Sequence, residues 1–158
     1  MIYTEMTKKA IQISFDAHRN QLDRAGLPYV YHPYHLAERM EDETSVCAAL
    51  LHDVVEDTEL TFDDLIAQGI SQEVVDALRL LTHPEGMPYM EYVRRIAASG
   101  NPHAIRVKLA DLHHNSDLTR LPRVDEAALK RREKYLAAIS LLTLSQRGGA
   151  DECPDSAP

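Results

Sequence analysis

Apolar residues recur three or four positions apart along most of this chain, and no segment alternates apolar with polar residues. The first spacing is typical of amphipathic helices, and alternation is typical of half-buried strands. Residues 71–81 illustrate the helical pattern: Ser71 is a candidate N-cap, and an apolar stripe follows at Val74, Val75, Leu78 and Leu81. The sequence therefore predicts an all-α fold of seven or eight helices.

Turn and capping residues divide this pattern into segments. Gly26 and Pro28 should end the first helix, and Thr61 with Asp64 forms a candidate capping box. Residues 29–33 should be extended, because a proline biases the residue before it away from the helical region. We expect helices over residues 10–24, 34–40, 47–57, 61–69, 71–81, 89–100, 103–121 and 125–146.

The length of 158 residues suits one domain with a single core. We expect residues 1–146 to form this domain and the polar residues 147–158 to be a disordered tail. Two cysteines, Cys47 and Cys153, make no disulfide framework, so we expect reduced thiols. The charged N-terminal residues lack the apolar core of a signal peptide, and no apolar run is long enough to span a membrane. These features indicate a soluble, cytoplasmic protein without a membrane partner.

The net charge of −8 argues against nucleic acid as the main partner, since proteins that follow the phosphate backbone are usually basic. A small anionic ligand would need a metal ion, or a few local Lys and Arg side chains, in order to bind. The sequence leaves open whether the chain forms a homo-oligomer.

The segment AALLHDVVEDTEL, residues 48–60, joins a buried-looking apolar run to four ionisable residues. Successive side chains on a helix rotate by about 100°, so His52 and Glu56 lie one turn apart. Asp53 and Asp57 do so as well, and the four side chains span roughly 140° of arc. Taken alone, the stretch is equally compatible with a solvated acidic helix end and with one wall of a functional site.

Two further places offer metal ligands, namely His32 in the expected bend and Asp111 in VKLADLHHN. Imidazole and carboxylate ligands from separate elements suit a divalent first-row ion, and the oxygen ligands favour manganese. Lys108 and Asn115 lie one turn before and after Asp111, so an ammonium, a carboxylate and an amide share one helix face. Each residue alone is more often a packed or solvated side chain, so spacing alone does not decide its role.

Other histidines and basic residues carry weaker signals. His113 and His114 should point away from the face of Asp111, and we do not expect them to be metal ligands. The run KRREK, residues 130–134, should be the solvated face of the last helix, with a basic patch for a ligand or an oligomer as the alternative.

Three extended motifs occur in order: PYVYHP at residues 28–33, AALLHDVVEDT at 48–58 and VKLADLHHN at 107–115. Together they resemble the HD superfamily of metal-dependent phosphohydrolases. The resemblance is to the hydrolase domain of RelA/SpoT-type alarmone enzymes and to single-domain small alarmone hydrolases of the metazoan SpoT homologue type. AHRNQ, residues 17–21, also fits the opening helix of that family, and the resemblance covers about residues 5–145.

The resemblance implies an all-α HD fold with one manganese ion, held by His32, His52, Asp53 and Asp111. It also implies that Glu56 and Asp57 handle the attacking water and that Asn115 helps to position the substrate. Candidates for contacts to substrate phosphates are Arg24, Lys108 and Arg19.

Some positions depart from the family's pattern. Asp23 and Leu112 stand where the alarmone enzymes usually carry basic residues, and Thr119 is out of step with a hydroxyl of the family. Each change removes an expected contact to pyrophosphate or nucleotide while leaving the metal ligands whole. Substrate identity is therefore less constrained by the sequence than metal chemistry is.

The function implied is manganese-dependent hydrolysis of the 3′-pyrophosphate of ppGpp or pppGpp, giving GDP or GTP and pyrophosphate. We expect a hydrolase without a synthetase half. One alternative keeps the chemistry and changes the nucleotide, for example to pppApp or NADPH. A second alternative is a non-catalytic alarmone sensor, although the retention of every implied site residue favours an enzyme.

Overall fold

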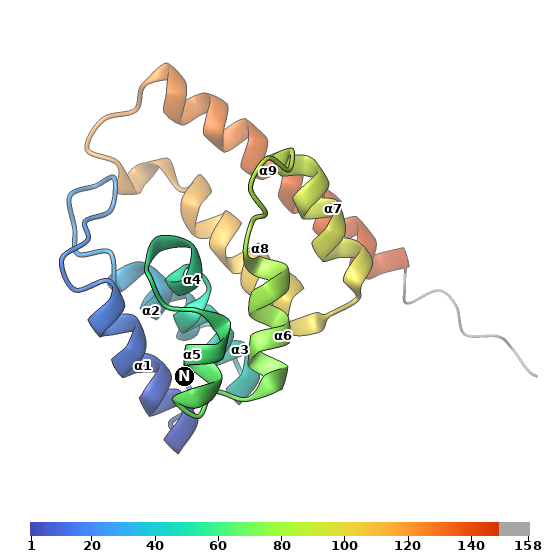
Figure 1. Cartoon of the computed structure of the whole chain (residues 1–158). Coiled ribbons are helices and arrows are strands. Elements are labelled where there is room, and N and C mark those ends of the chain that lie inside the picture. Colours follow the sequence, from blue (N-terminus) through green and yellow to red (C-terminus); the bar gives the residue numbers. More distant parts are fainter. Residues whose placement is uncertain (149–158) are drawn as a thin grey trace, which may run out of the picture.

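The computed structural model describes residues 1–148. The regular secondary structure of this part of the chain is helical, apart from one isolated β-bridge (Figure 1). The predicted all-α fold is confirmed. The α-helices are α1 (Glu5–Ala17), α2 (Tyr31–Ala37), α3 (Glu43–Leu51), α4 (Val54–Asp57), α5 (Phe62–Ala67), α6 (Gln72–Leu81), α7 (Tyr89–Ser99), α8 (Pro102–Ser116) and α9 (Glu126–Gly148). A short 3₁₀ turn, η1 (Leu118–Arg120), follows α8.

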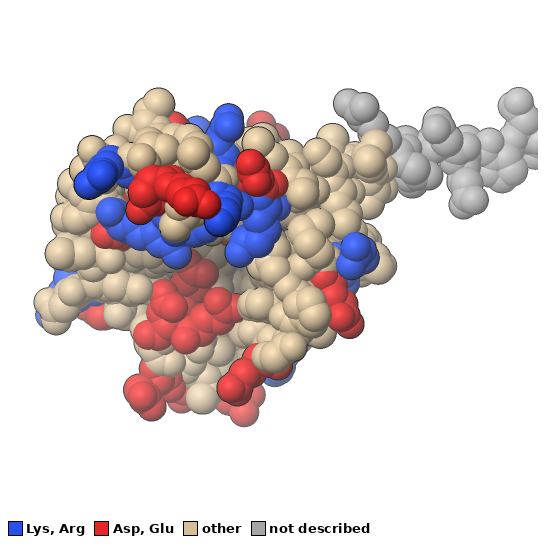
Figure 2. Space-filling model, turned by 90° about the horizontal axis from the view of Figure 1, so that it is seen from above, with Lys and Arg blue, Asp and Glu red and all other residues tan. Residues whose placement is uncertain are grey.

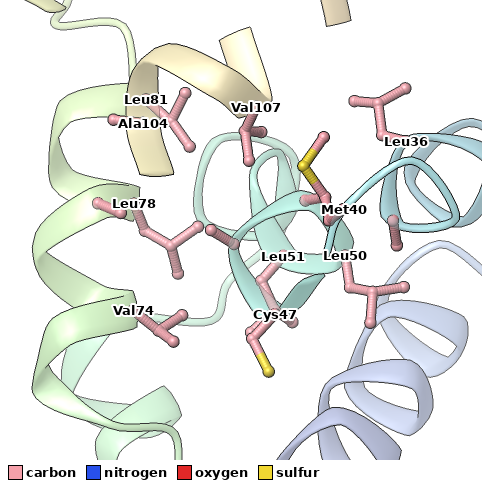
Figure 3. Packing of buried hydrophobic residues seen from close by; sticks show 14 of the residues in the cluster. Leu36, Met40, Cys47, Leu50, Leu51, Val74, Leu78, Leu81, Ala104 and Val107 are labelled. Carbon is pink, nitrogen blue, oxygen red and sulfur yellow. The ribbon is translucent and has the colours of Figure 1, made fainter. Parts of the chain in front are cut away.

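α3 forms the centre of the core, and every residue from Ser45 to Leu51 is buried. It packs against α1, α2, α6 and α8. Figure 3 shows Cys47 and Leu51 of α3 beside the apolar side chains of α6. Cys47 is a free thiol with no exposed surface, and burial raises its pKa to about 12. A helix that is apolar on all sides is stable only when other helices enclose it, as they do here.

Capping side chains fix where several helices begin. Asp42, Ser71 and Asn101 each accept a hydrogen bond from a backbone N–H in the first turn of α3, α6 and α8. Thr61 and Asp64 make both bonds of the predicted capping box at α5. These contacts satisfy N–H groups that the first turn of a helix leaves without a partner.

The first helix ends at Ala17, so the prediction that it continues to about residue 24 is wrong. The cause lies in Asp23, whose carboxylate accepts hydrogen bonds from the backbone N–H groups of Ala25 at 2.8 Å and Leu27 at 2.9 Å. An aspartate that binds nearby backbone N–H groups in this way competes with helix formation. Leu22 and Pro28 form the isolated β-bridge, and residues 18–30 are a loop.

The prediction that residues 29–33 are extended is also wrong, since residues 29–30 form a turn and α2 follows directly. Tyr31 and His32 begin α2, and Pro33 occupies its first turn. A proline is tolerated there because the first N–H groups of a helix have no partner within the helix.

The predicted helix over residues 47–57 is divided into α3 and α4. The backbone of Asp53 has φ −102° and ψ −5°, which marks the change of direction between the two helices. His52 is the C-cap residue of α3, and Asp53 is the N-cap residue of α4. The break changes which way these two side chains point, and the functional site depends on it.

α9 lies along α7 and α8 at the opposite end of the molecule from α5 (Figure 1). Ala138 and Leu142 are buried, whereas Leu129, Leu136 and Leu144 are exposed. α9 extends over the first two residues of the predicted tail, and residues 149–158 of that tail lie outside the described part of the chain. No helix within residues 1–148 is long and apolar enough to cross a membrane.

Candidate metal and substrate site

Three side chains from two different places in the sequence converge beneath the loop of residues 18–30. His32 in α2, His52 at the end of α3 and Asp53 at the start of α4 each offer one ligand atom, and these atoms lie within 4.8 Å of one another. Both imidazoles are buried, and Asp53 is half-buried. We refer to these three residues as the His–Asp cluster.

The break between α3 and α4 makes this cluster possible. On one continuous helix His52 and Asp53 would diverge by about 100°. In the structure Nε2 of His52 lies 3.0 Å from Oδ2 of Asp53, so both side chains face the same space.

His52 is oriented as a ligand would be. Its Nδ1 lies 2.8 Å from the carbonyl oxygen of Ala49 and donates to it, so Nε2 is the ring nitrogen that faces the cluster. Nε2 is buried, and no group in residues 1–148 forms a hydrogen bond of good geometry with it. A histidine that donates one ring N–H to a backbone carbonyl and points the other nitrogen at a cluster of oxygens is typical of a metal ligand.

Asp111 in the middle of α8 lies beside the cluster. Its Oδ1 is 3.3 Å from Nε2 of His32, and its Oδ2 accepts a hydrogen bond from Nζ of Lys108 at 2.9 Å. The amide of Asn115 donates to Oδ1 of Asp111. The predicted ammonium, carboxylate and amide of α8 are thus in contact with one another.

The charges of this region depend on one another. Burial opposes ionisation of Asp111, but Lys108 and the two histidines hold its pKa well below the usual range. Burial likewise opposes the charged form of Lys108, and Asp111 raises its pKa well above the usual value. Burial lowers the pKa of His52, but Asp53 and Asp111 raise it further, so the net shift is upward. The two carboxylates thus stabilise positive charge at the cluster.

The donor set fits a divalent metal ion. The two imidazoles and the carboxylate of the His–Asp cluster combine the ligand types of first-row metal sites, and the carboxylate of Asp111 lies beside them. The His–Asp cluster is therefore a possible metal site.

Glu56 and Asp57 occupy different surroundings. Glu56 accepts a hydrogen bond from the backbone N–H of His83, and partial burial of its carboxylate raises its pKa despite that bond. Asp57 is exposed and accepts a hydrogen bond from Nε2 of Gln21 at 3.0 Å. Both side chains are exposed, and Glu56 is the one that a backbone N–H of a distant segment holds in place.

Tyr29 contacts the His–Asp cluster directly. Its hydroxyl donates a hydrogen bond to Oδ2 of Asp53, and its ring lies against those of His18 and His32. Burial, followed by the negative charge of Asp53, raises the pKa of the Tyr29 hydroxyl far above its usual value. Tyr29 therefore stays protonated and orients Asp53.

His114 is a site residue that sequence reasoning missed. Its ring stacks on that of His32 at 4.8 Å between centroids, and the two Nδ1 atoms are 2.6 Å apart. Burial, with the neighbouring His32, lowers the pKa of His114 to about 3. The expectation that His114 points away from Asp111 is wrong, whereas His113 is exposed. The signal was present in the sequence, since residues three apart share a helix face.

A cavity of about 290 Å³ opens beside His32. Residues 21–25, Tyr29, Asn115, the segment after α8 and the first turns of α9 form its walls. It contains the predicted Arg24, Arg131 of the KRREK run, and Arg120, which the sequence did not indicate. Seen from above, the molecule gathers Lys and Arg side chains on one side of a hollow and Asp and Glu side chains on the other (Figure 2). We refer to this space as the arginine cavity.

Arg131 belongs to the run that was expected to be a solvated face, and its side chain is half-buried on the cavity wall. Arg19 does not line the arginine cavity; it pairs with Asp16 at 2.5 Å.

No protein-family model matches the chain. It is 32% identical over 144 residues to a probable GTP pyrophosphokinase of Mycobacterium leprae, which covers 81% of this chain and 18% of that protein. It is 32% identical over 122 residues to the bifunctional (p)ppGpp synthase/hydrolase SpoT of Escherichia coli, which covers 68% of this chain and 17% of that protein. The chain therefore spans less than a fifth of the length of these relatives.

Among solved structures, the chain is similar to a metazoan orthologue of SpoT that hydrolyses ppGpp. The TM-score is 0.73 and the sequence identity 26%, and the match covers 94% of this chain and 89% of that chain. The shared helical fold is the one that the sequence motifs around His32, His52 and Asp53 indicated. The chain is a SpoT/RelA hydrolase-like domain.

Proposed function

We propose that this protein is a manganese-dependent hydrolase that removes the 3′-pyrophosphate of ppGpp or pppGpp. The observation that carries the proposal is the buried Nε2 of His52, which faces His32 and Asp53 and has no hydrogen-bond partner of good geometry within residues 1–148. The similarity to SpoT proteins supports the choice of substrate class.

His32, His52, Asp53 and Asp111 would hold the ion. A divalent ion bound there would lower the pKa of a coordinated water and polarise a phosphoryl oxygen. Tyr29, Lys108 and Asn115 orient the two carboxylates by hydrogen bonds, so the ligands need little rearrangement.

Glu56 would accept the proton of the attacking water. Its raised pKa suits a group that must take up a proton near neutral pH, and the His83 amide fixes its carboxylate. Asp57 would assist from the exposed side. The water oxygen would bond to the phosphorus next to the 3′ oxygen, and the bond between that phosphorus and the 3′ oxygen would break. The 3′ oxygen would take up a proton, and the products would be GDP or GTP and pyrophosphate.

The arginine cavity would receive the rest of the nucleotide. Arg24 is exposed on its wall and makes no ion pair within the described residues, so it is available to a phosphate. Asn115 lies between the cavity and Asp111 and would bridge substrate and metal ligands. The ammonium group of Lys108 is bound to Asp111. We therefore expect Lys108 to attract the substrate phosphates by its positive charge and not by a direct contact.

Hydrolysis of another nucleotide, such as pppApp or NADPH, is the second candidate. The observation that favours it is Asp23, an acidic residue on the cavity wall where related enzymes usually carry a basic one. We further infer that the activity resides in one domain, residues 1–146, because all proposed site residues lie within it. We also expect the protein to be located in the cytoplasm, where its nucleotide substrate would be found.

The test is a product assay on protein stripped of metal and then supplied with manganese, with ppGpp, pppApp and NADPH offered in parallel. Pyrophosphate and GDP from ppGpp, formed only with metal, would support the proposal. Turnover of another nucleotide alone would transfer the same chemistry to that substrate. Binding of ppGpp without turnover of any substrate would leave a sensor as the function.

A matched pair of variants tests the site itself. His52→Ala should lose metal and activity, whereas His113→Ala, an exposed histidine of α8, should retain both. Equal activity of the two variants would remove His52 from the site.

A further inference from the structure

An ion pair between residues far apart in the sequence crosses the wall of the arginine cavity. Nη2 of Arg120 lies 2.9 Å from Oδ2 of Asp23, and both side chains line the cavity. The Arg120 side chain is 28% exposed and that of Asp23 is 12% exposed, so solvent screens the pair only in part. The pair joins the loop of residues 18–30 to η1.

Both carboxylate oxygens of Asp23 are already engaged within the protein. Oδ1 accepts the backbone N–H groups of Ala25 and Leu27, at 2.8 Å and 2.9 Å, and Oδ2 accepts Arg120. Asp23 therefore does not replace the basic residue of the related enzymes as a substrate contact. It acts on the cavity through Arg120.

Arg120 is held at two points. Nη1 donates to the backbone carbonyl of His114 at 3.1 Å, and Nη2 donates to Asp23. Guanidinium carries five N–H groups in a rigid plane, so three remain without a partner among residues 1–148. A guanidinium fixed in this way is pre-organised to donate two parallel hydrogen bonds to a planar partner.

The charge of Asp23 decides which partner suits Arg120. Because Asp23 offsets the positive charge of Arg120, a further anion gains less there than at Arg24 or Arg131, for which no ion pair is found in residues 1–148. A neutral ligand that offers two hydrogen-bond acceptors does not lose affinity when Asp23 offsets the charge of Arg120. Leu118, Leu121 and Ala128 line the same cavity and provide apolar surface for a flat ring.

Purine bases differ at the edge that such a group can read. Guanine presents two adjacent acceptors, O6 and N7, and arginine binds both. Adenine presents one acceptor and one amino donor at the same edge, and the donor opposes an arginine N–H. We propose that Arg120, positioned by Asp23, reads the O6/N7 edge of a guanine base and gives this cavity its preference for guanine over adenine nucleotides. The inference rests on the proposed nucleotide hydrolase function and assigns its base specificity to a residue.

The experiment compares GDP with ADP, by calorimetric titration in the presence of manganese, for the wild type and two variants. Arg120→Gln should weaken GDP binding roughly 5- to 150-fold, the range expected for one bidentate base contact. ADP binding should change by less than about threefold, since adenine makes no such contact. Arg120→Lys keeps the charge but lacks the planar fork, so it should lose the GDP preference as well.

Asp23→Asn tests the positioning role. It retains an oxygen that can accept the N–H groups of the turn but removes the negative charge. We expect the GDP-to-ADP ratio to fall, because Arg120 becomes free to turn toward phosphate. For the same reason, binding of tri- over diphosphates should improve for both bases alike. A purely structural role of Asp23 would weaken the binding of GDP, ADP, GTP and ATP equally.

The controls separate the two proposals. Arg123→Gln, an exposed arginine that is not part of the cavity wall, should leave all affinities unchanged. Equal losses for GDP and ADP in both Arg120 variants would show a phosphate contact and overturn the inference alone, with hydrolysis by the wild type intact. A wild type that neither binds nor hydrolyses any of these purine nucleotides would overturn the proposed function and the inference together.

Discussion

Glu56 and Glu59 are three positions apart, and among the two only Glu56 forms a hydrogen bond with another segment of residues 1–148, through the backbone N–H of His83. Replacing Glu56 by Gln keeps the shape of the side chain and the acceptor for that amide, but removes the proton-accepting carboxylate. We expect Glu56→Gln to retain bound manganese and to lose about 10²- to 10⁴-fold in kcat, the usual contribution of general acid–base catalysis.

The measurement is kcat together with metal content per chain. Glu59→Gln, an exposed neighbour, should match the wild type in both. Wild-type turnover in Glu56→Gln would assign the proton transfer to another residue.

Asp111 contacts His32, Lys108 and Asn115 at once, so its carboxylate supports the site in several ways. We expect Asp111→Ala to lose metal binding and activity together. Because that variant leaves Lys108 buried without its partner, Asp111→Asn provides a second test with less loss of stability. Metal content and the far-ultraviolet circular dichroism spectrum check the result, and full metal occupancy in a folded variant would exclude Asp111 as a ligand.

At the level of elements, helices with strong local signals were predictable. Ser71 and Thr61 cap α6 and α5 as their sequence positions indicated, because a cap depends on residues within one turn. The division between α3 and α4 was not predictable, since no Gly or Pro marks it. It places His52 and Asp53 against His32, a contact made by tertiary packing.

The burial of α3 on all sides makes its side chains the most sensitive to truncation. Leu51 has no exposed surface, so Leu51→Ala should lower the free energy of unfolding by about 2–5 kcal/mol. Leu144 of α9 is 66% exposed, and Leu144→Ala should change it by no more than about 0.5 kcal/mol. Urea unfolding of both variants measures the difference, and similar values would contradict the central place of α3.

At the scale of the whole molecule, the proposed ligands come from α2, from the junction of α3 and α4, and from α8. An ion that binds only the folded chain stabilises it by about 2.7 kcal/mol at a concentration one hundred times the dissociation constant. For a chain of this size, that corresponds to a rise in Tm of about 5–10 °C. Thermal melts with manganese and after chelation measure the shift. Asp111→Asn should show no shift, and an equal shift in the variant would place the ion elsewhere.

The members of the His–Asp cluster could be identified from the sequence because motifs carry them within short, matching stretches. The arginine cavity could not, because its walls combine residues from distant segments. Asp23 and Arg120 are 97 positions apart, and no sequence motif links the two residues. Arg131 looked like part of a solvated basic run, since periodicity does not show that η1 and the loop of residues 18–30 cover one side of α9.

The thiol of Cys47 has a practical consequence. It lies at the centre of α3 without exposed surface, and its raised pKa keeps it protonated near neutral pH. A chemical reagent can reach the sulfur only when the helices around α3 separate. In a chain whose Cys153 is replaced by Ser, the rate of alkylation would therefore report how often the whole core opens. The alkylation rate of Cys47 is therefore a measure of how often the fold opens globally.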